Sequence, residues 1–225
     1  MIHGAWHGSW CWQRLGDVLD ERRVPWLAID LPTSSGEDSS IDLTADVSEL
    51  RRFSLDRGPL VLVAHSYGGA VAVEAAPSIE GLRGIVYLAA LVPRPGQTVS
   101  DVSREYGLRS ALDECIRRED DFLRLDPPPA ARALYGDCDE ETRQWAISQV
   151  GTQTLASFRT PRTSGVTPVA TTYVICGRDE ALPPEVQAGV AARCDEVVLI
   201  DSDHSPFLSR PALIADLLHS KYLVD

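Results

Sequence analysis

The sequence predicts an α/β domain built around a doubly wound, mostly parallel sheet. Short runs that are apolar at every position predict buried parallel strands, because helices cover both faces of such a sheet. Stretches with helical character lie between these runs, and this alternation is typical of doubly wound folds. The predicted strands are residues 26–30, 60–64, 84–90, 172–176 and 196–201, and the predicted helices are residues 11–22, 42–56, 68–80, 184–193 and 206–221.

The length and composition fit a single large globular domain. A chain of 225 residues can bury roughly 70% of its unfolded surface, so it needs no disulfide or metal for stability. The net charge of −12 repels phosphate groups, so neither nucleic acid nor a membrane surface is expected as a partner. There is also no apolar run of the length, about 18 residues, that a transmembrane helix requires.

The cysteines and histidines suggest no metal centre and no cofactor. The five cysteines are odd in number and widely spaced, which favours reduced thiols over a disulfide framework or a zinc site. The start of the chain has no basic segment followed by an apolar stretch, so no signal peptide is expected. We therefore expect a cytoplasmic protein, either monomer or homodimer, that acts on a small molecule.

Residues 94–165 interrupt the alternation of strands and helices. They are rich in arginine and acidic residues, and they contain helical patches at 110–124 and 139–149 but no convincing strand. Because ligands of open sheets bind at the carboxyl ends of the strands, we interpret this segment as a helical lid over those ends. A solvated helical appendage is the alternative. The predicted organisation is a core of residues 1–93 and 166–225 with a lid of residues 94–165.

A nucleophile is predicted where the strand at 60–64 meets the following helix. The sequence Ala-His-Ser-Tyr-Gly-Gly places Ser66 in a strand–turn–helix context that the G-x-S-x-G elbow requires. Ala64 and Gly68 supply the small residues that this tight turn needs. The N–H of Tyr67 stands at the start of the helix, where backbone donors favour a negative oxygen. We predict Ser66 as nucleophile and the Tyr67 N–H as an oxyanion donor.

A general base and an acid are expected near the last two strands. His204 follows the last predicted strand, and Pro206 is well suited to begin the next helix. Asp179 follows the strand at 172–176, which agrees with the chain order Ser, Asp, His known for this kind of elbow. Asp203 is the alternative acid, although its position beside His204 would tend to point its side chain away.

The N-terminal loop supplies the second oxyanion donor. Its sequence, His-Gly-Ala-Trp-His-Gly-Ser-Trp-Cys-Trp from His3, is the only glycine-rich loop that could serve the elbow. Together with the Ser66 motif it resembles the α/β-hydrolase superfamily, and within it the branch of plant methylesterases, plant hydroxynitrile lyases and small bacterial esterases. The resemblance implies an α/β-hydrolase fold, Ala5 as the second oxyanion N–H and Asp179 as the acid. Only two residues precede His3, where the family usually has a longer strand, so either the strand begins upstream of Met1 or it is very short; a shortened N-terminal part of the sheet is expected.

This combination predicts a serine esterase that cleaves a small-molecule carboxylic ester through an acyl-enzyme. Trp6, Trp145 and Phe158 are the predicted substrate-binding residues, although aromatic residues of the segment could equally form its own core. His3 and His7 are expected to shape the loop.

Two other functions stay open. One is a C–C lyase of the hydroxynitrile lyase type, and the other is a ligand-binding receptor on the same fold. The lyase branch carries Thr and Lys where this chain has Gly4 and Ser205, which favours the esterase.

Overall fold

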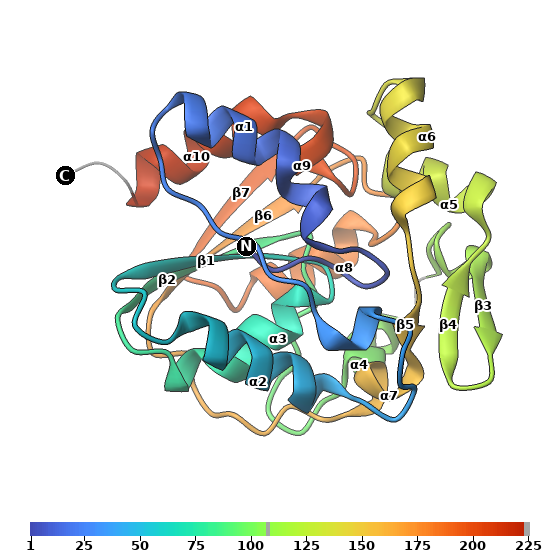
Figure 1. Ribbon diagram of the computed structural model, residues 1–225, viewed down its shortest axis with the longest axis horizontal. Coiled ribbons are helices and arrows are strands. Elements are labelled where there is room, and N and C mark those ends of the chain that lie inside the picture. The colour runs from blue at the N-terminus through green and yellow to red at the C-terminus, as the bar shows by residue number, and fades with distance from the viewer. Residues whose placement is uncertain (107–108, 223–225) are drawn as a thin grey trace.

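The central sheet is parallel and lies between two layers of helices (Figure 1). The computed structural model describes residues 1–106 and 109–222. All neighbouring strands of the sheet run parallel. The predicted doubly wound fold is therefore confirmed. In spatial order, the strands are β1 (Leu60–His65), β2 (Leu82–Leu88), β6 (Ala170–Cys176) and β7 (Glu196–Ile200). The side chains of β1, β2 and β6 are mostly buried, whereas the edge strand β7 is mostly exposed.

The N-terminal part of the sheet is reduced to single bridges beside β1. Ile2 forms one parallel bridge to Ala64 and another to Ile29. The predicted strand at 26–30 therefore contributes one bridge instead of a full strand, and the expected shortening is confirmed. The backbone of Ile2 also donates to Val63 O at 2.8 Å and accepts from His65 N at 3.0 Å. These bonds hold the start of the N-terminal loop against the end of β1.

The helices follow from the apolar periodicity and from local capping. In α2 (Leu43–Ser54), the side chain of Asp42 caps the helix by accepting from the Thr44 N–H at 2.8 Å. The interior of α3 is apolar on all sides because it is buried between the sheet and α2. The helix α8 (Pro184–Ala191) packs on β6. One face carries α1 (Gln13–Glu21), α9 (Pro206–Ser209) and α10 (Pro211–Tyr222), and the other carries α2 (Leu43–Ser54) and α3 (Gly68–Ala75) (Figure 1).

The segment of residues 94–165, hereafter the insertion, connects β2 to β6. Figure 1 shows its outer elements beside the carboxyl ends of the sheet strands, where the arrows point. It contains three short antiparallel strands in the order β3-β4-β5 as well as helices. Its elements are α4 (Val99–Glu105), β3 (Ile116–Glu119), β4 (Phe122–Leu125), α5 (Pro127–Leu134), α6 (Glu140–Gln149), β5 (Gln153–Thr154) and α7 (Leu155–Arg159).

The expectation of a purely helical insertion was wrong for residues 110–124. Glu119 pairs with Phe122 across a two-residue turn, which makes this part a hairpin. Asp120 in that turn has φ +53°, a left-handed conformation that aspartate tolerates better than most residues. The helix expected at 139–149 is confirmed as α6, which the carboxylate of Asp139 caps.

Short 3₁₀ turns complete the chain at Ser9–Trp12, Pro32–Ser34, Ala76–Ser78 and Asp113–Cys115.

Across residues 1–106 and 109–222, no helix combines the length and the apolar character needed to cross a bilayer.

Candidate active site

Ser66 stands in a strained turn between β1 and α3. Its φ of +50° lies in the left-handed region, which costs a non-glycine residue about 1–3 kcal/mol. The turn is held by a bond from Ser66 N to Leu88 O at 3.2 Å and by one from Leu91 N to Ser66 O at 2.9 Å. A Cβ at Gly68 would lie 2.6 Å from His3 O, so the helix start must be glycine. Ser66 is partly exposed between two buried neighbours.

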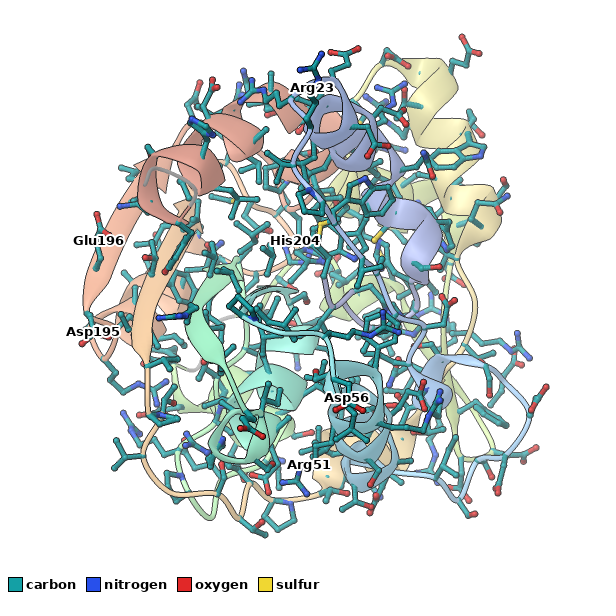
Figure 2. The ribbon with its side chains drawn as sticks, turned by 60° about the vertical axis from the view of Figure 1, so that its left-hand side comes forward. Arg23, Arg51, Asp56, Asp195, Glu196 and His204 are labelled. Carbon is teal, nitrogen blue, oxygen red and sulfur yellow. The ribbon has the colours of Figure 1, made fainter. Side chains whose placement is uncertain are left out.

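His204 and Asp179 form a buried pair. Nδ1 of His204 lies 2.7 Å from Oδ2 of Asp179, and both side chains are almost fully buried. Because the carboxylate can only accept, Nδ1 carries the ring proton and Nε2 is left as an acceptor. Figure 2 shows His204 toward the middle of the molecule, whereas the labelled Arg23, Asp195 and Glu196 lie at its periphery. Nε2 of His204 is thus the ring nitrogen that can accept a proton.

The Asp179 carboxylate is fixed by three further donors. Oδ1 accepts from the N–H groups of Ala181 at 2.8 Å and Leu182 at 2.7 Å. Oδ2 also accepts from Nε2 of Gln187, on α8, at 2.8 Å. Sequence reasoning missed Gln187, since a lone glutamine on a helix gives no sign of its partner. With these bonds the carboxylate has little freedom to turn away from His204.

Asp203, the alternative acid, faces away from the His204 ring. Its Oδ2 accepts from the Asp137 N–H at 3.1 Å, and its Oδ1 accepts from the Ser209 hydroxyl at 2.8 Å. In return the Asp203 N–H donates to Oδ2 of Asp137 at 3.1 Å. Burial raises the pKa of the Asp203 carboxyl. This residue fastens the loop that carries His204 to the insertion.

His65 brings the elbow, the base and the N-terminal loop together. Its Nε2 lies 3.0 Å from His204 O, and the two ring centroids are 4.5 Å apart. A Cβ at Gly4 would lie 2.9 Å from both Nδ1 of His65 and Cβ of Ser66. Burial lowers the pKa of His65 well below its usual range, so the ring is neutral. Its role in joining the three segments was not expected from the sequence.

The two predicted oxyanion donors are unpaired. Within the described residues, neither the Ala5 N–H nor the Tyr67 N–H has a hydrogen-bond partner. Ala5 and Tyr67 are both buried, and buried backbone N–H groups normally have a hydrogen-bond partner. Two such donors beside a strained serine suit an oxygen that becomes negative during reaction.

His3 and His7 shape the N-terminal loop through its carbonyl groups. Nδ1 of His3 bonds to Gly4 O, and Nδ1 of His7 bonds to Ala5 O, each at 2.8 Å. Burial lowers the pKa of His3 to about 4 and that of His7 to about 3. Both rings are therefore neutral near pH 7 and hold the loop by hydrogen bonds alone.

Two of the three predicted substrate-binding residues lie together. Phe158 stands 5.9 Å from the Trp6 ring and 5.6 Å from the Tyr67 ring, centroid to centroid. These rings form an apolar wall next to the residue that carries one oxyanion donor. Trp145 is 39% exposed and packs edge-on against Trp10 instead.

Other candidate features lie away from these residues. A surface hollow of about 530 Å³ between α2 and α7 includes Asp42, Asp121 and Arg159, but none of the predicted site residues. Among the residues described, no group of three or more histidine, cysteine or acidic side chains is arranged to hold a metal ion.

Comparison with known proteins places this geometry in a family. The model of the alpha/beta hydrolase family matches residues 1–217. The chain belongs to that family. It is 28% identical to methylesterase 7 of Arabidopsis thaliana over 97% of this chain and 93% of that protein. It is 27% identical to the alpha/beta hydrolase nvfD of Aspergillus novofumigatus, over 98% of this chain and 94% of that protein.

A solved structure agrees with the same fold. The pyrethroid hydrolase of Sphingobium faniae JZ-2 superposes with a TM-score of 0.83 at 23% identity, covering 97% of this chain and 94% of that one. The expected resemblance to the plant methylesterase branch and to small bacterial relatives is confirmed. The protein is thus an esterase-like α/β hydrolase.

Proposed function

We propose that this protein is a serine hydrolase that cleaves a small-molecule carboxylic ester through an acyl-enzyme. The observation that carries the proposal is the buried 2.7 Å pair of His204 and Asp179, held next to the elbow that presents Ser66. Its relatives support an ester substrate, since two of them are named methylesterase 7 and methyl jasmonate esterase 1.

The first half of the reaction forms the acyl-enzyme. Nε2 of His204 takes the proton of the Ser66 hydroxyl as Oγ bonds to the ester carbonyl carbon. The carbonyl oxygen becomes negative and is met by the N–H groups of Ala5 and Tyr67. Asp179 stabilises the imidazolium. The intermediate then collapses, the bond to the alcohol oxygen breaks, and His204 returns the proton to that oxygen.

The second half regenerates the enzyme with water. His204 accepts a proton from the water, whose oxygen bonds to the acyl carbon. The same two N–H groups meet the second negative oxygen. When this intermediate collapses, the bond to Ser66 Oγ breaks and His204 returns the proton to Oγ. The products are a carboxylic acid and an alcohol.

The substrate class follows from the wall formed by Trp6 and Phe158. Phe158 packs against both Trp6 and Tyr67, and this aromatic group favours an apolar or aryl substituent over a charged one. The lyase alternative would need a group that stabilises a departing cyanide. Ser205 and Gly4 offer no cation, and a side chain at Gly4 would meet His65.

The test uses the wild-type protein with p-nitrophenyl esters and methyl esters of aryl acids. We expect an initial burst of p-nitrophenol equal to the amount of enzyme, followed by slower turnover. A fluorophosphonate should modify Ser66 with a matching loss of activity. Cyanide release from mandelonitrile without ester cleavage would replace the proposal by the lyase, and ligand-induced stabilisation without any turnover would replace it by a receptor.

A further inference from the structure

Trp6, next to the predicted donor Ala5, is bonded to the insertion through all of its polar atoms. Its N–H donates to Oε1 of Gln153 at 3.3 Å, and its carbonyl accepts from the Gly151 N–H at 2.8 Å. Its indole Nε1–H donates to Leu123 O at 3.0 Å. Trp6 also has φ +64°, which a bulky side chain adopts only when its surroundings hold it there. The insertion supplies those surroundings.

The peptide that joins Ala5 to Trp6 is held at both ends. Gln153 accepts from its N–H, and His7 donates to its carbonyl. His7 is backed by a bond at 2.8 Å from the hydroxyl of Tyr135, which also belongs to the insertion. The Ala5 N–H lies one peptide earlier, so loss of these bonds would free the backbone dihedrals of Ala5 that orient it. The aim of that donor therefore depends on the insertion.

The amide of Gln153 has only one orientation that satisfies its neighbours. Its Oε1 accepts from Trp6 N and from the Ser34 hydroxyl at 2.7 Å. Its Nε2 donates to the hydroxyls of Thr33 at 2.8 Å and Ser157 at 2.7 Å. A flipped amide would place Nε2 against the Trp6 N–H, donor to donor. The side chain is fully buried, so all of its bonding capacity is used inside the protein.

The same chain of bonds continues to the residue with the second donor. The hydroxyl of Thr33 donates to Oδ2 of Asp46 at 2.6 Å. This carboxylate oxygen also accepts from the hydroxyl of Tyr67 at 2.7 Å. Gln153 thus touches the loop of Ala5 directly and the side chain of Tyr67 through two intermediate residues. No other residue described above connects to both donors in this way.

We propose that Gln153 is a positioning residue that aims the Ala5 donor and braces the side chain of Tyr67, so that the oxyanion site is complete only when the insertion is docked on Trp6. The inference rests on the proposed esterase function, in which Ala5 and Tyr67 stabilise the oxyanion. An N–H that is misdirected stabilises the transition state less, although substrate can still bind against the aromatic wall. The loss therefore falls on kcat more than on KM.

The test replaces Gln153 with methionine, which has a similar length but cannot accept from Trp6 N. Gln149→Met is the matched control, because Gln149 is exposed on the last turn of α6 and, among the residues described, its side chain bonds to Ser148 alone. We expect Gln153→Met to lower kcat by about ten- to a hundred-fold, the range for a modest misplacement of a reacting group, with KM within about threefold. Gln149→Met should match the wild type in both constants.

Two further measurements separate positioning from simple loss of stability. An aryl trifluoromethyl ketone forms a serine adduct with a negative oxygen, so its affinity should fall with kcat, whereas affinity for the product acid should hold. Amide hydrogen exchange of residues 1–12 should speed up in Gln153→Met while that of β2 and β6 stays slow. If the methionine variant does not fold, Gln153→Asn, which shortens the amide by one methylene, serves for the same measurements.

The outcomes distinguish this inference from the proposed function. A wild type without burst or fluorophosphonate labelling overturns both. A normal wild-type burst together with an unchanged kcat in a folded Gln153 variant overturns the inference alone, and so does unchanged hydrogen exchange in residues 1–12. A rise in KM at constant kcat would make Gln153 a determinant of binding instead and would equally overturn it.

Discussion

The two loops that carry the proposed oxyanion donors are held in opposite ways. The elbow of Ser66 and Tyr67 is set by its own strand, its own helix and the neighbouring end of β2. The loop of Ala5 and Trp6 is set by residues of the insertion, far away along the chain. The strand–turn–helix unit at the end of β1 thus supports one donor, whereas a segment outside the sheet supports the other. The contrast implies that substitutions in the insertion change the rate as well as the substrate.

The largest effect is expected in the elbow itself, from Ser66→Ala. Without the hydroxyl there is no covalent route, and only binding and the oxyanion donors remain, so kcat should fall by at least about 10⁴-fold. Thermal unfolding should be unchanged, because alanine keeps the same backbone strain. Activity above a few per cent of the wild type would mean that the reaction does not pass through Ser66.

The next effect compares two aspartates, one in the loop that follows β6 and one that contacts the insertion. Asp179→Asn should lower kcat by up to about 10⁴-fold, because an amide favours the wrong tautomer of His204. Asp203→Asn should cost less than about tenfold, since the carboxylate bonds to Asp137 and Ser209 and not to the ring. Steady-state kinetics of both variants decides which acid serves His204, and a reversed order would assign the role to Asp203.

A smaller effect concerns the stability contributed by Asp46, whose carboxyl bonds to both Thr33 and Tyr67. Burial raises the pKa of Asp46 from 3.8 to about 6. The folded state therefore binds more protons than the unfolded state between these values, and this group makes the protein less stable as the pH rises from 4 to 6. Its contribution amounts to up to about 3 kcal/mol.

The change to measure is the difference in unfolding free energy between the wild type and Asp46→Asn, from urea titrations at pH 4, 5, 6 and 7. Asparagine does not titrate, so the wild type should lose stability relative to the variant as the pH rises. A difference that does not vary with pH would show that the pKa of Asp46 is the same in the folded and unfolded states.

The smallest effect is expected in the insertion, from Tyr135→Phe. The change removes the donor to His7 and leaves a buried ring nitrogen unpaired, which costs about 1–3 kcal/mol. Because His7 still bonds to Ala5 O, kcat should fall only a few-fold. Tyr106→Phe, in the same insertion but packed over Gly189, is the control. Chemical denaturation and steady-state kinetics of both variants test the difference, and equal behaviour would remove Tyr135 from the support of the loop.

The parts of the molecule that were predictable depend on short-range signals. The elbow was predictable because a buried strand, small residues and a helix start fall within eight positions. His204 and Asp179 follow strands whose apolar runs are visible in the sequence. The hairpin of β3 and β4 was missed because Arg117, Arg118 and Glu119 are all exposed, so the strand shows no alternation of apolar and polar residues.

The supporting residues were missed for a different physical reason. Gln153, Gln187 and Asp46 act by hydrogen bonds to partners that are distant in sequence or on another element. A buried amide or carboxyl has no periodicity of its own, and its partner becomes visible only when the chain is folded. The sequence therefore predicted the groups proposed to react, but not the groups that hold them in place.

The bonds of Trp6 also have a consequence for the order in which the protein assembles. Its partners Leu123 and Gln153 are 117 and 147 residues away. During synthesis the loop of Trp6 leaves the ribosome well before Leu123 and Gln153, which fix its conformation. Closing loops of this size is slow compared with forming a local turn or helix. We therefore expect the loop of Trp6 to be made early yet to be among the last segments to reach its final shape, so that a newly made chain acquires its sheet before it acquires the proposed activity.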